Sequence, residues 1–428
     1  MRTGREQAAL CKRRERKMKK YTSLEKAWIL YDVGNSAFTL LVSTIIPIYF
    51  NYLAEEAGLS SVAYLAYWGY AASVATLAVA FIGPVFGAVA DTKNYKKPVF
   101  LATLLVGAVG CVAMGIATTW LSFLVIFVIA RIGYSSSLVF YDSMLHDVTE
   151  PDRLDEVSSQ GYAWGYIGSC IPFIVSLGIV LGAGSLGLSM QTAMGISFLI
   201  VAAWWLLAST PLLKKYRQIH YVEKEPGMVS ESFGRLWRTL KELAKDRKIL
   251  IFLVAYFFYI DGVYTIIDMA TAYGTALGLD TTGLLLALLV TQIVAFPSAI
   301  VFGKLTKKYP SANLITVCIL AYTGIAIFAM FMESQFQFWI LAVCVGLFQG
   351  GIQALSRSHF AKLIPPEKSG EYFGLLDICG KGASFIGTTL VGVVSQLTGS
   401  TNLGVSVLAV VFVAGLFLFR LSVRRMRA

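Results

Sequence analysis

The sequence predicts an all-α integral membrane protein whose twelve transmembrane helices form two six-helix bundles. Two observations lead to this fold class. Hydrophobic residues make up 57% of the 428 residues and charged residues only 14%, a composition that excludes an ordinary water-soluble domain. The chain also contains twelve apolar segments of ~20 residues or more, the length that an α-helix needs to cross ~30 Å of hydrocarbon.

These apolar segments are 27–52, 63–90, 98–117, 121–142, 159–181, 190–212, 249–271, 282–303, 312–332, 336–357, 371–396 and 401–422. The first of them follows a basic stretch, and a signal peptide likewise has a basic region followed by an apolar one. It is too long for one, however, contains Asp32 and Asn35, and lacks a small-x-small cleavage pattern at its end. We therefore expect an uncleaved first transmembrane helix.

Basic residues predict how the chain is threaded through the membrane. Only Arg131 and Lys381 lie deep inside an apolar segment, and the odd-numbered gaps contain neither Lys nor Arg. Those gaps are 55–61, 118–120, 182–189, 272–280, 333–335 and 398–402. Because cytoplasmic loops collect Lys and Arg, both termini are predicted to be cytoplasmic. The net charge of +11 is then explained by topology and by attraction to anionic lipid headgroups, not by nucleic acid.

The longest polar stretch divides the chain into two halves. The predicted parts are a basic tail (1–26), a six-helix bundle (27–213), a cytoplasmic connector (214–248), a second bundle (249–423) and a basic end (424–428). Within the connector, apolar residues recur at helical spacing: Phe233, Leu236, Trp237, Leu240, Leu243 and Ala244. This pattern predicts an amphipathic helix at the membrane interface, and a plain soluble connector helix is the alternative.

Internal repetition relates the two halves. Residues 151–156 (Pro-Asp-Arg-Leu-Asp-Glu) and 366–371 (Pro-Glu-Lys-Ser-Gly-Glu) follow the fourth and tenth segments, 215 positions apart. The same offset pairs Asp142 with Arg357. Such spacing is typical of a duplicated half whose copies are related by an axis along the membrane normal.

Residues 87–97 (Gly-Ala-Val-Ala-Asp-Thr-Lys-Asn-Tyr-Lys-Lys) connect the second and third segments. They resemble the signature of this loop in the major facilitator superfamily: Gly, three residues, Asp, a tight turn and basic residues. Asn94 and Tyr95 replace the usual Gly and Arg of the turn, and Asn tolerates left-handed geometry. In that superfamily the loop latches the two halves together on the cytoplasmic side.

The resemblance implies that the latch has gating residues at the cytoplasmic ends of the helices. By this resemblance we assign the gating role to Gly87, Asp91, Lys96 and Lys97, and we add Asp142, Arg357 and Glu371 from the repeated segments. The Asp91 carboxylate is expected to face helix N-termini of the other half. The counterpart loop, 303–308, lacks the acid, so we expect a lopsided latch.

Four further motifs resemble one branch of that superfamily almost from end to end. They are Tyr-Asp-Val-Gly-Asn-Ser-Ala-Phe (31–38), Gly-Tyr-Ala-Trp-Gly-Tyr (161–166), Gly-Gly-Ile-Gln-Ala-Leu-Ser-Arg-Ser (350–358), and Ile-Pro-Pro followed by Glu-Tyr-Phe-Gly-Leu (364–375). The branch is the vacuole effluxers, whose fungal members resemble amino-acid exporters linked to autophagy. The resemblance implies transport of a small molecule, with amino acids as the leading substrate class.

Polar residues inside the apolar segments are the candidates for binding substrate or ion, because such groups need a partner or a watery cavity in the membrane. They are Asp32, Asn35, Arg131, Asp261, Asp268, Gln349, Gln353 and Lys381. Structural alternatives remain for two of them. Lys381 can pair with Asp377 one turn earlier, and Asp32 can brace helix packing near the cytoplasmic end.

We therefore expect a secondary active transporter that moves a small solute, most simply an amino acid, by alternating access. Proton-linked efflux by a monomer in the cytoplasmic (inner) membrane of a cell is the predicted mode. Efflux of amphipathic drugs or lipids is one alternative, and a membrane sensor that moves no solute is another. The six cysteines and three histidines are scattered, and no phosphate-binding loop or nucleophile–base pair is present. Accordingly, no metal, cofactor or enzymatic activity is expected.

Overall fold

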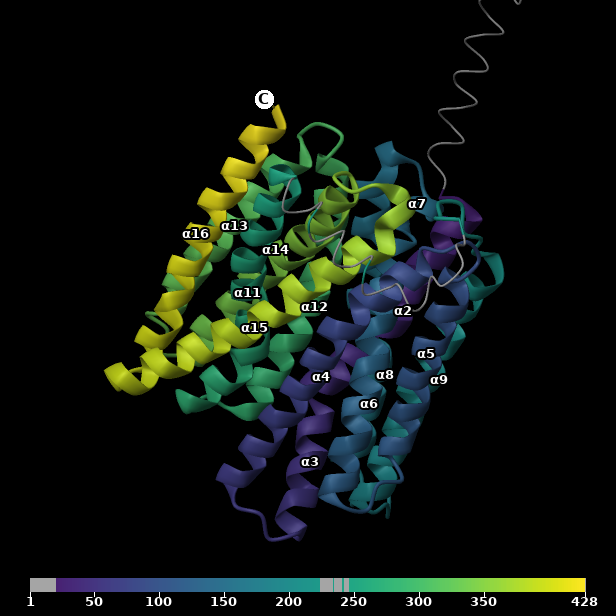
Figure 1. The fold of residues 1–428 in the computed structure, drawn as a ribbon. Helices are drawn as coiled ribbons and strands as arrows, with labels where there is room; N and C mark the ends of the chain where they lie inside the picture. Colours follow the sequence, from purple (N-terminus) through teal and green to yellow (C-terminus); the bar gives the residue numbers. More distant parts are fainter. Residues whose placement is uncertain (1–20, 224–233, 235–240, 242–245, 428) are drawn as a thin grey trace, which may run out of the picture.

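The computed structural model describes residues 21–223, 234, 241 and 246–427, without the side chains of a few helical residues that include Lys381. The basic tail and most of the predicted amphipathic connector helix therefore lie outside the described residues. The described chain is helical almost throughout (Figure 1), and its β-structure consists of an isolated bridge between Thr92 and Val222.

The first half contains α2 (Ser23–Ser43), α3 (Ile45–Glu56), α4 (Ser61–Ala90), α5 (Lys96–Met114), α6 (Trp120–Ser143), α7 (Leu145–Val148), the 3₁₀ turn η1 (Pro151–Arg153), α8 (Leu154–Leu181) and α9 (Met190–Lys215). The second half contains α11 (Arg247–Ala276), α12 (Thr281–Leu305), α13 (Ser311–Ala329), α14 (Gln335–Ala361), η2 (Pro366–Lys368), α15 (Ser369–Thr398) and α16 (Thr401–Arg427). Each half thus supplies six long membrane-crossing elements.

Among the described residues, eleven helices are long and apolar enough to cross a membrane. The remaining predicted span corresponds to α15, which contains a shorter apolar stretch, Ile386–Thr398. The predicted first span differs in one respect. It is not a single helix, because Thr44 (φ −134°, ψ −72°) leaves helical geometry and separates α2 from α3. The Thr44 hydroxyl donates to the Leu40 carbonyl, so it satisfies a backbone acceptor next to the break.

Each half packs mainly within itself, and a small number of helices join the two halves. In the first half α2 lies against α8 and α9, and in the second α11 lies against α15 and α16. Contacts between the halves run from α4 and α6 to α15, and from α8 to α12 and α14. Figure 1 shows the two sets of helices inclined to each other, with α15 crossing toward α4.

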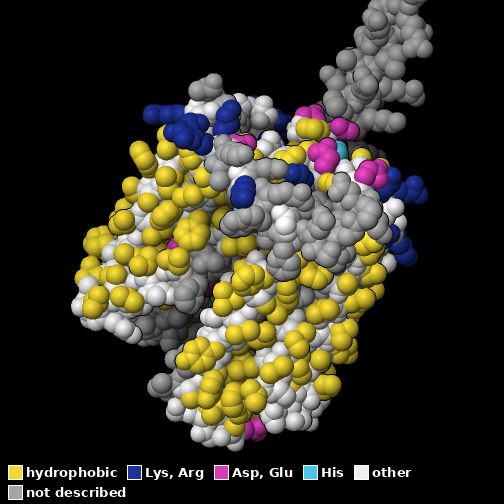
Figure 2. Space-filling view, viewed as in Figure 1, with side chains coloured by type: hydrophobic (Ala, Val, Ile, Leu, Met, Phe, Trp, Pro, Cys, Tyr) yellow, Lys and Arg dark blue, Asp and Glu magenta, His cyan; other side chains and the backbone are white. Residues whose placement is uncertain are grey.

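Lys and Arg gather at one end of the molecule, which we call the basic end (Figure 2). Lys93, Lys215, Lys307 and Lys362 belong to it. Away from this end, Figure 2 shows a recess between the two halves. The halves are therefore joined at the basic end and separate toward the opposite end.

A seam of glycines lets α4 and α15 approach closely. A Cβ atom built on Gly374 would lie 2.6 Å from the backbone nitrogen of Pro84 and 2.7 Å from the carbonyl carbon of Gly83. A Cβ atom on Gly87 would collide with the carbonyl oxygen of Gly370. Because the obstacles are backbone atoms, a side chain at these positions requires the helices to move apart.

We expect Gly374→Val to separate the halves at the basic end. The measurement is the distance between spin labels at Glu150 and Glu367, both exposed, in a variant without native cysteines. Gly392→Val is the matched control on the same helix, because nothing lies within 4 Å of a Cβ atom there. An unchanged label distance in Gly374→Val, with the protein folded, would contradict the close approach of α4 and α15.

Candidate functional site

Arg357, at the C-terminal end of α14, reaches from the second half into the first. Its Nη1 lies 2.9 Å from an Asp142 carboxylate oxygen on α6, and its Nη2 lies 3.4 Å from Asp32 on α2. Nε and Nη2 also donate to the hydroxyl and the carbonyl of Ser158 on α8, each at 2.9 Å. One guanidinium, only 4% exposed, therefore holds three helices of the other half.

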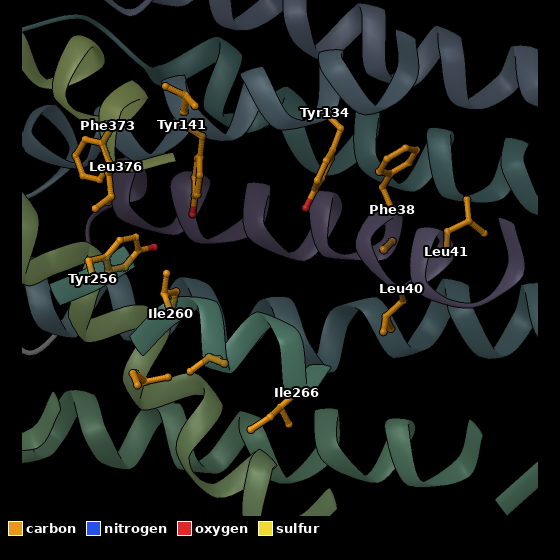
Figure 3. Packing of buried hydrophobic residues seen from close by; sticks show 14 of the residues in the cluster. Phe38, Leu40, Leu41, Tyr134, Tyr141, Tyr256, Ile260, Ile266, Phe373 and Leu376 are labelled. Atoms are coloured by element: carbon orange, nitrogen blue, oxygen red, sulfur yellow. The ribbon is translucent and has the colours of Figure 1, made fainter. Parts of the chain in front are cut away.

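Aromatic rings enclose this guanidinium. Its carbon lies 4.6 Å from the ring centre of Trp28, 5.6 Å from that of Tyr141 and 4.3 Å from that of Tyr162. Tyr141 in turn stacks on Trp28, with ring centres 4.3 Å apart. Figure 3 shows Tyr141 and Tyr134 extending from α6 toward α2, with Tyr256 and Ile260 of α11 nearby. The rings shield the ion pairs from water and add cation–π attraction. We call Arg357 with Asp32, Asp142, Ser158 and these three rings the Arg357 cluster.

Asp91, just beyond α4, holds the N-terminus of α15. Its two carboxylate oxygens accept backbone hydrogen bonds from Gly370 (2.8 Å) and Glu371 (2.9 Å). Lys96 lies 3.2 Å from the same carboxylate, with both side chains fully buried, and donates to the Ser369 hydroxyl at 2.8 Å. Burial raises the pKa of the Asp91 carboxyl, and Lys96 and the two N–H groups act against that rise. The carboxylate thus meets the positive end of a helix dipole from the other half.

The symmetry-related side of the basic end joins the halves by ion pairs between side chains, not by a carboxylate bound to helix N–H groups. Here the acids are on the first half, near the start of α8, and the lysines are on the second half. Lys307 pairs with Glu156 at 3.0 Å, and Lys362 pairs with Asp155. Although residues 303–308 lack the acid of residues 87–97, the halves are joined on both sides. The latch is lopsided in chemistry and exposure, since the Lys307 side chain is 62% exposed whereas Lys96 is buried.

The turn between α4 and α5 is itself held by the start of the connector. Asn94 has φ 68°, the left-handed conformation that its residue type tolerates. Backbone hydrogen bonds join Val222 to Asp91 (2.8 Å) and to Lys93 (3.1 Å). On α7, the Asp147 carboxylate accepts hydrogen bonds from the backbone N–H groups of residues 219 and 220 and from the Tyr216 hydroxyl. Residues 216–223 therefore hold the turn between α4 and α5, which carries Asp91, against the rest of the first half.

His146, next to Asp147, contacts the other half. Its Nε2 lies 2.7 Å from the carbonyl oxygen of Ala361, the residue 215 positions later. Asp142 and Arg357 are also 215 positions apart. Residues at equivalent positions in the two repeats thus meet each other, as expected where α6 and α14 approach the axis that relates the halves. Burial lowers the pKa of His146, and its Nδ1 has no hydrogen-bond partner.

Arg131 on α6 and Asp268 on α11 belong to opposite halves and to none of the contacts described above. Arg131 is half-buried and Asp268 is exposed, although both lie within apolar helices. The charge of Arg131 acts on the Asp268 carboxylate, yet no ion pair within 4 Å joins them among the described side chains. The ring of Tyr134 lies 5.9 Å from the Arg131 guanidinium. A cation on the first half and a carboxylate on the second half therefore influence each other electrostatically without forming an ion pair.

The remaining candidates have separate locations. Asn35 donates to the Asp32 carboxylate at 3.2 Å, so it lies beside the Arg357 cluster. Gln353, on the same helix as Arg357, accepts a hydrogen bond from the Tyr166 hydroxyl. Asp261 is buried between α11 and α15, and Gln349 lines a cavity inside the second half. Lys97 is partly exposed at the basic end. The side chain of Lys381, and with it the Asp377 pairing, lies outside the described residues.

Sequence reasoning missed several residues that join the halves: Ser158, His146, Asp155, Glu156 and Lys362. Asp155 and Glu156 were recognised only as part of the repeated segment 151–156 and were given no role in joining the halves, and Ser158 and Lys362 lie in no distinctive sequence pattern. The offset of 215 would have found His146 opposite Ala361, had it been extended one turn beyond Asp142. Sequence reasoning also left the neighbours of Arg131 open, since the rotation of a helix about its axis decides which side chains face each other.

Comparison with solved structures identifies the fold as that of major facilitator transporters. The Escherichia coli fucose:proton symporter FucP superimposes with a TM-score of 0.70, at 16% identity, over 94% of this chain and 97% of that one. The human organic anion transporter MFSD10 (TETRAN) gives 0.65, at 16% identity, over 92% and 98%. This likeness shows the fold, that of a multi-pass membrane protein of the major facilitator type.

Sequence comparison narrows the class to one family. The model of the family described as "Vacuole effluxer Atg22 like" matches residues 22–428, so the chain belongs to that family. It is 42% identical over 404 residues, 93% of this chain, to an uncharacterized MFS-type transporter of Bacillus subtilis, YxiO, of which it covers 94%. It is 26% identical over 374 residues to autophagy-related protein 22 of Saccharomyces cerevisiae, covering 78% of this chain and 66% of the relative.

Arg357→Gln is expected to destabilise the folded state by about 3–5 kcal/mol, because it leaves the buried Asp32 and the partly buried Asp142 without their cation. Thermal unfolding in detergent measures this loss, and the spin-label distance between Glu150 and Glu367 measures separation at the basic end. Lys307→Gln is the control, since an exposed pair contributes about 1 kcal/mol or less. Equal effects of the two substitutions would exclude a central role for Arg357.

Protonation of His146 in acid is expected to destabilise the joined state at the basic end, because it places a charge in a buried site. The hydrogen bond to the Ala361 carbonyl favours the protonated imidazole and offsets only part of this cost. Because burial lowers the pKa of His146, the joined state favours neutral imidazole. Its contribution is complete above the ordinary His pKa of about 6.5 and falls as the pH drops below that value. The label distance at the basic end should therefore lengthen between about pH 7 and 5 in the parent protein and less so in His146→Gln. His220→Gln controls for the neighbouring imidazole, and identical pH profiles in parent and His146→Gln would refute the idea.

Proposed function

We propose that the protein is a secondary transporter that exports amino acids from the cytoplasm by alternating access, driven by protons, in the cytoplasmic (inner) membrane of a bacterial cell. Membership of the vacuole-effluxer family and the 42% identity to a bacterial MFS-type transporter support transport of a small molecule. The positive-inside pattern of Lys and Arg supports a cytoplasmic location for the basic end. The proposal extends these findings to a substrate class, a direction and a driving ion.

The observation that carries the amino-acid assignment is the pair of opposite charges on apolar helices of opposite halves. The Arg131 guanidinium can bind a carboxylate through two parallel hydrogen bonds, and Asp268 can accept from an ammonium group. Neither side chain neutralises the other in a direct ion pair among the described residues. A zwitterion supplies both missing partners at once, whereas a neutral sugar or a simple cation supplies one or none.

The contacts at the basic end provide the gate in this proposal. The Arg357 cluster and the Asp91 contact with α15 close that end and involve both halves. The recess at the other end gives solute access from the opposite side of the membrane. Rocking of the halves would break the Arg357 and Asp91 contacts and open the basic end to the cytoplasm. Gly87, Asp91, Lys96, Lys97, Asp142, Arg357 and Glu371 are the residues to which we assign this gating.

The test is counterflow of a labelled amino-acid panel in proteoliposomes. Arg131→Gln and Asp268→Asn should each raise the half-saturating concentration about 10- to 100-fold, because each removes a charge-assisted hydrogen bond worth about 1.5–3 kcal/mol. Lys308→Gln, which removes an exposed charge at the basic end, should leave exchange unchanged.

The outcomes separate the candidate substrates. Stereoselective exchange that depends on Arg131 and Asp268 supports an amino-acid carrier. Absence of exchange for every amino acid, from folded and correctly inserted protein, rules out that substrate class. Counterflow of amphipathic compounds in the same vesicles would then identify the alternative, efflux of drugs or lipids.

A further inference from the structure

Arginines at the C-terminal end of α16 continue the exposed apolar face of that helix. Val410, Val413 and Phe417 are 69%, 54% and 70% exposed, and the exposed Arg420 and Arg424 follow at the same spacings of three and four residues. Side chains at such spacings share one face of an α-helix. One face of α16 therefore runs from apolar side chains to two guanidinium groups over about 21 Å, at ~1.5 Å per residue.

The first turn of α11 brings more positive charge to the same place. The Ser422 hydroxyl donates to the Lys248 carbonyl at 3.4 Å, so α11 begins beside the last turns of α16. Arg247 and Lys248 are exposed there, and so is Arg425, which lies about 60° from Ser422 around the axis of α16. These cations make up what we call the α11–α16 basic patch: Arg247, Lys248, Arg420, Arg424 and Arg425.

The cations of this patch differ from other cations of the basic end. Lys93 and Lys307 each pair with a glutamate, whereas no cation of the α11–α16 basic patch forms an ion pair among the described side chains. The acid beside them is Asp246, whose carboxylate caps α11 by accepting from the backbone N–H groups of Lys248 (3.0 Å) and Ile249 (3.4 Å). The patch therefore has an excess of positive charge that no described side chain neutralises.

A phospholipid with a negatively charged headgroup fits both the charge and the apolar face. A guanidinium binds a phosphate through two parallel hydrogen bonds, and Lys and Arg near a membrane surface attract anionic lipid. The acyl chains attached to that phosphate would then lie against Val413 and Phe417, whereas a free phosphate has nothing to place there. Figure 2 shows Lys and Arg side chains next to a hydrophobic surface at the C-terminal end of α16, as the two parts of a lipid require.

We propose that the α11–α16 basic patch binds an anionic phospholipid from the membrane leaflet that faces the basic end. Its phosphate binds Arg420 and Arg424, the other cations of the patch add attraction, and its acyl chains lie along the exposed face of α16. Because α16 packs against α11, α13 and α15, the lipid contacts the second half, apart from the side chains that join the halves. The proposal goes beyond solute transport and holds whatever the solute is.

The test titrates the full-length protein in detergent with phosphatidylglycerol and counts the bound lipids by native mass spectrometry. Phosphatidylcholine with the same acyl chains should need a concentration about tenfold or more higher, because its headgroup has no net charge. Arg420→Gln combined with Arg424→Gln should raise the half-saturating concentration of phosphatidylglycerol about tenfold or more. Glycerol phosphate, which has the phosphate without the chains, should not displace the lipid at an equal concentration. Thermal unfolding verifies that each variant is folded.

Lys214→Gln combined with Arg217→Gln is the matched control. Both residues are exposed at the basic end of α9, seven and ten positions after the exposed Leu207, and their loss removes the same charge from the first half. This variant should keep the half-saturating concentration within about twofold. Equal weakening in the two double variants, or equal binding of the two lipids, would overturn the proposed site. Displacement by glycerol phosphate would indicate a site for a free anion and would equally contradict the lipid assignment.

A second readout locates the acyl chains in a bilayer. Phosphatidylglycerol with a photoreactive diazirine in one acyl chain, incorporated into vesicles with the protein, should label α16 around Val413 and Phe417. Labelling there should fall about tenfold when Arg420 and Arg424 are both replaced by Gln. Labelling of α9 around Leu207 to the same extent as α16 in the parent protein would show general contact with lipid and would refute a specific site.

Discussion

The structure depends on one arginine placed between two carboxylates at the boundary of its halves. Arg357 brings a charge from α14 into the first half, where Asp32 and Asp142 neutralise it and Ser158 binds its remaining N–H groups. Because the guanidinium is buried, the loss of a carboxylate partner would leave a desolvated charge uncompensated, which is strongly destabilising. The relative position of the halves at the basic end is fixed accordingly.

The other contacts at the basic end share structural elements with this one. Asp91 holds α15 through two backbone N–H groups, and the connector holds the turn that carries Asp91. His146 and Asp147 are adjacent, and one contacts the second half whereas the other holds the connector. Opening of the basic end therefore involves the turn, α7, α15 and the connector together. Such linkage suits an alternating-access protein, which must exchange two discrete arrangements instead of deforming gradually.

Two kinds of intramembrane charge are separated in space by this architecture. Arg131 is half-buried and Asp268 is exposed, on helices of opposite halves, and we propose that a solute with both charges neutralises them. Asp261 lies inside the second half, where the backbone N–H of Gly387 and the Thr265 hydroxyl bind its carboxylate. One helix, α11, carries both Asp261 and Asp268.

The sequence by itself determined the helices, their order and the class of protein, because hydrocarbon demands long apolar segments and basic loops mark one side. It also identified Asp91, Asp142 and Arg357 as residues of one end. The tertiary structure alone decided that Arg357 lies between Asp32 and Asp142, and that His146 meets Ala361. The physical reason is that hydropathy fixes where a residue lies along a helix, whereas the rotation and crossing of packed helices fix which residues meet.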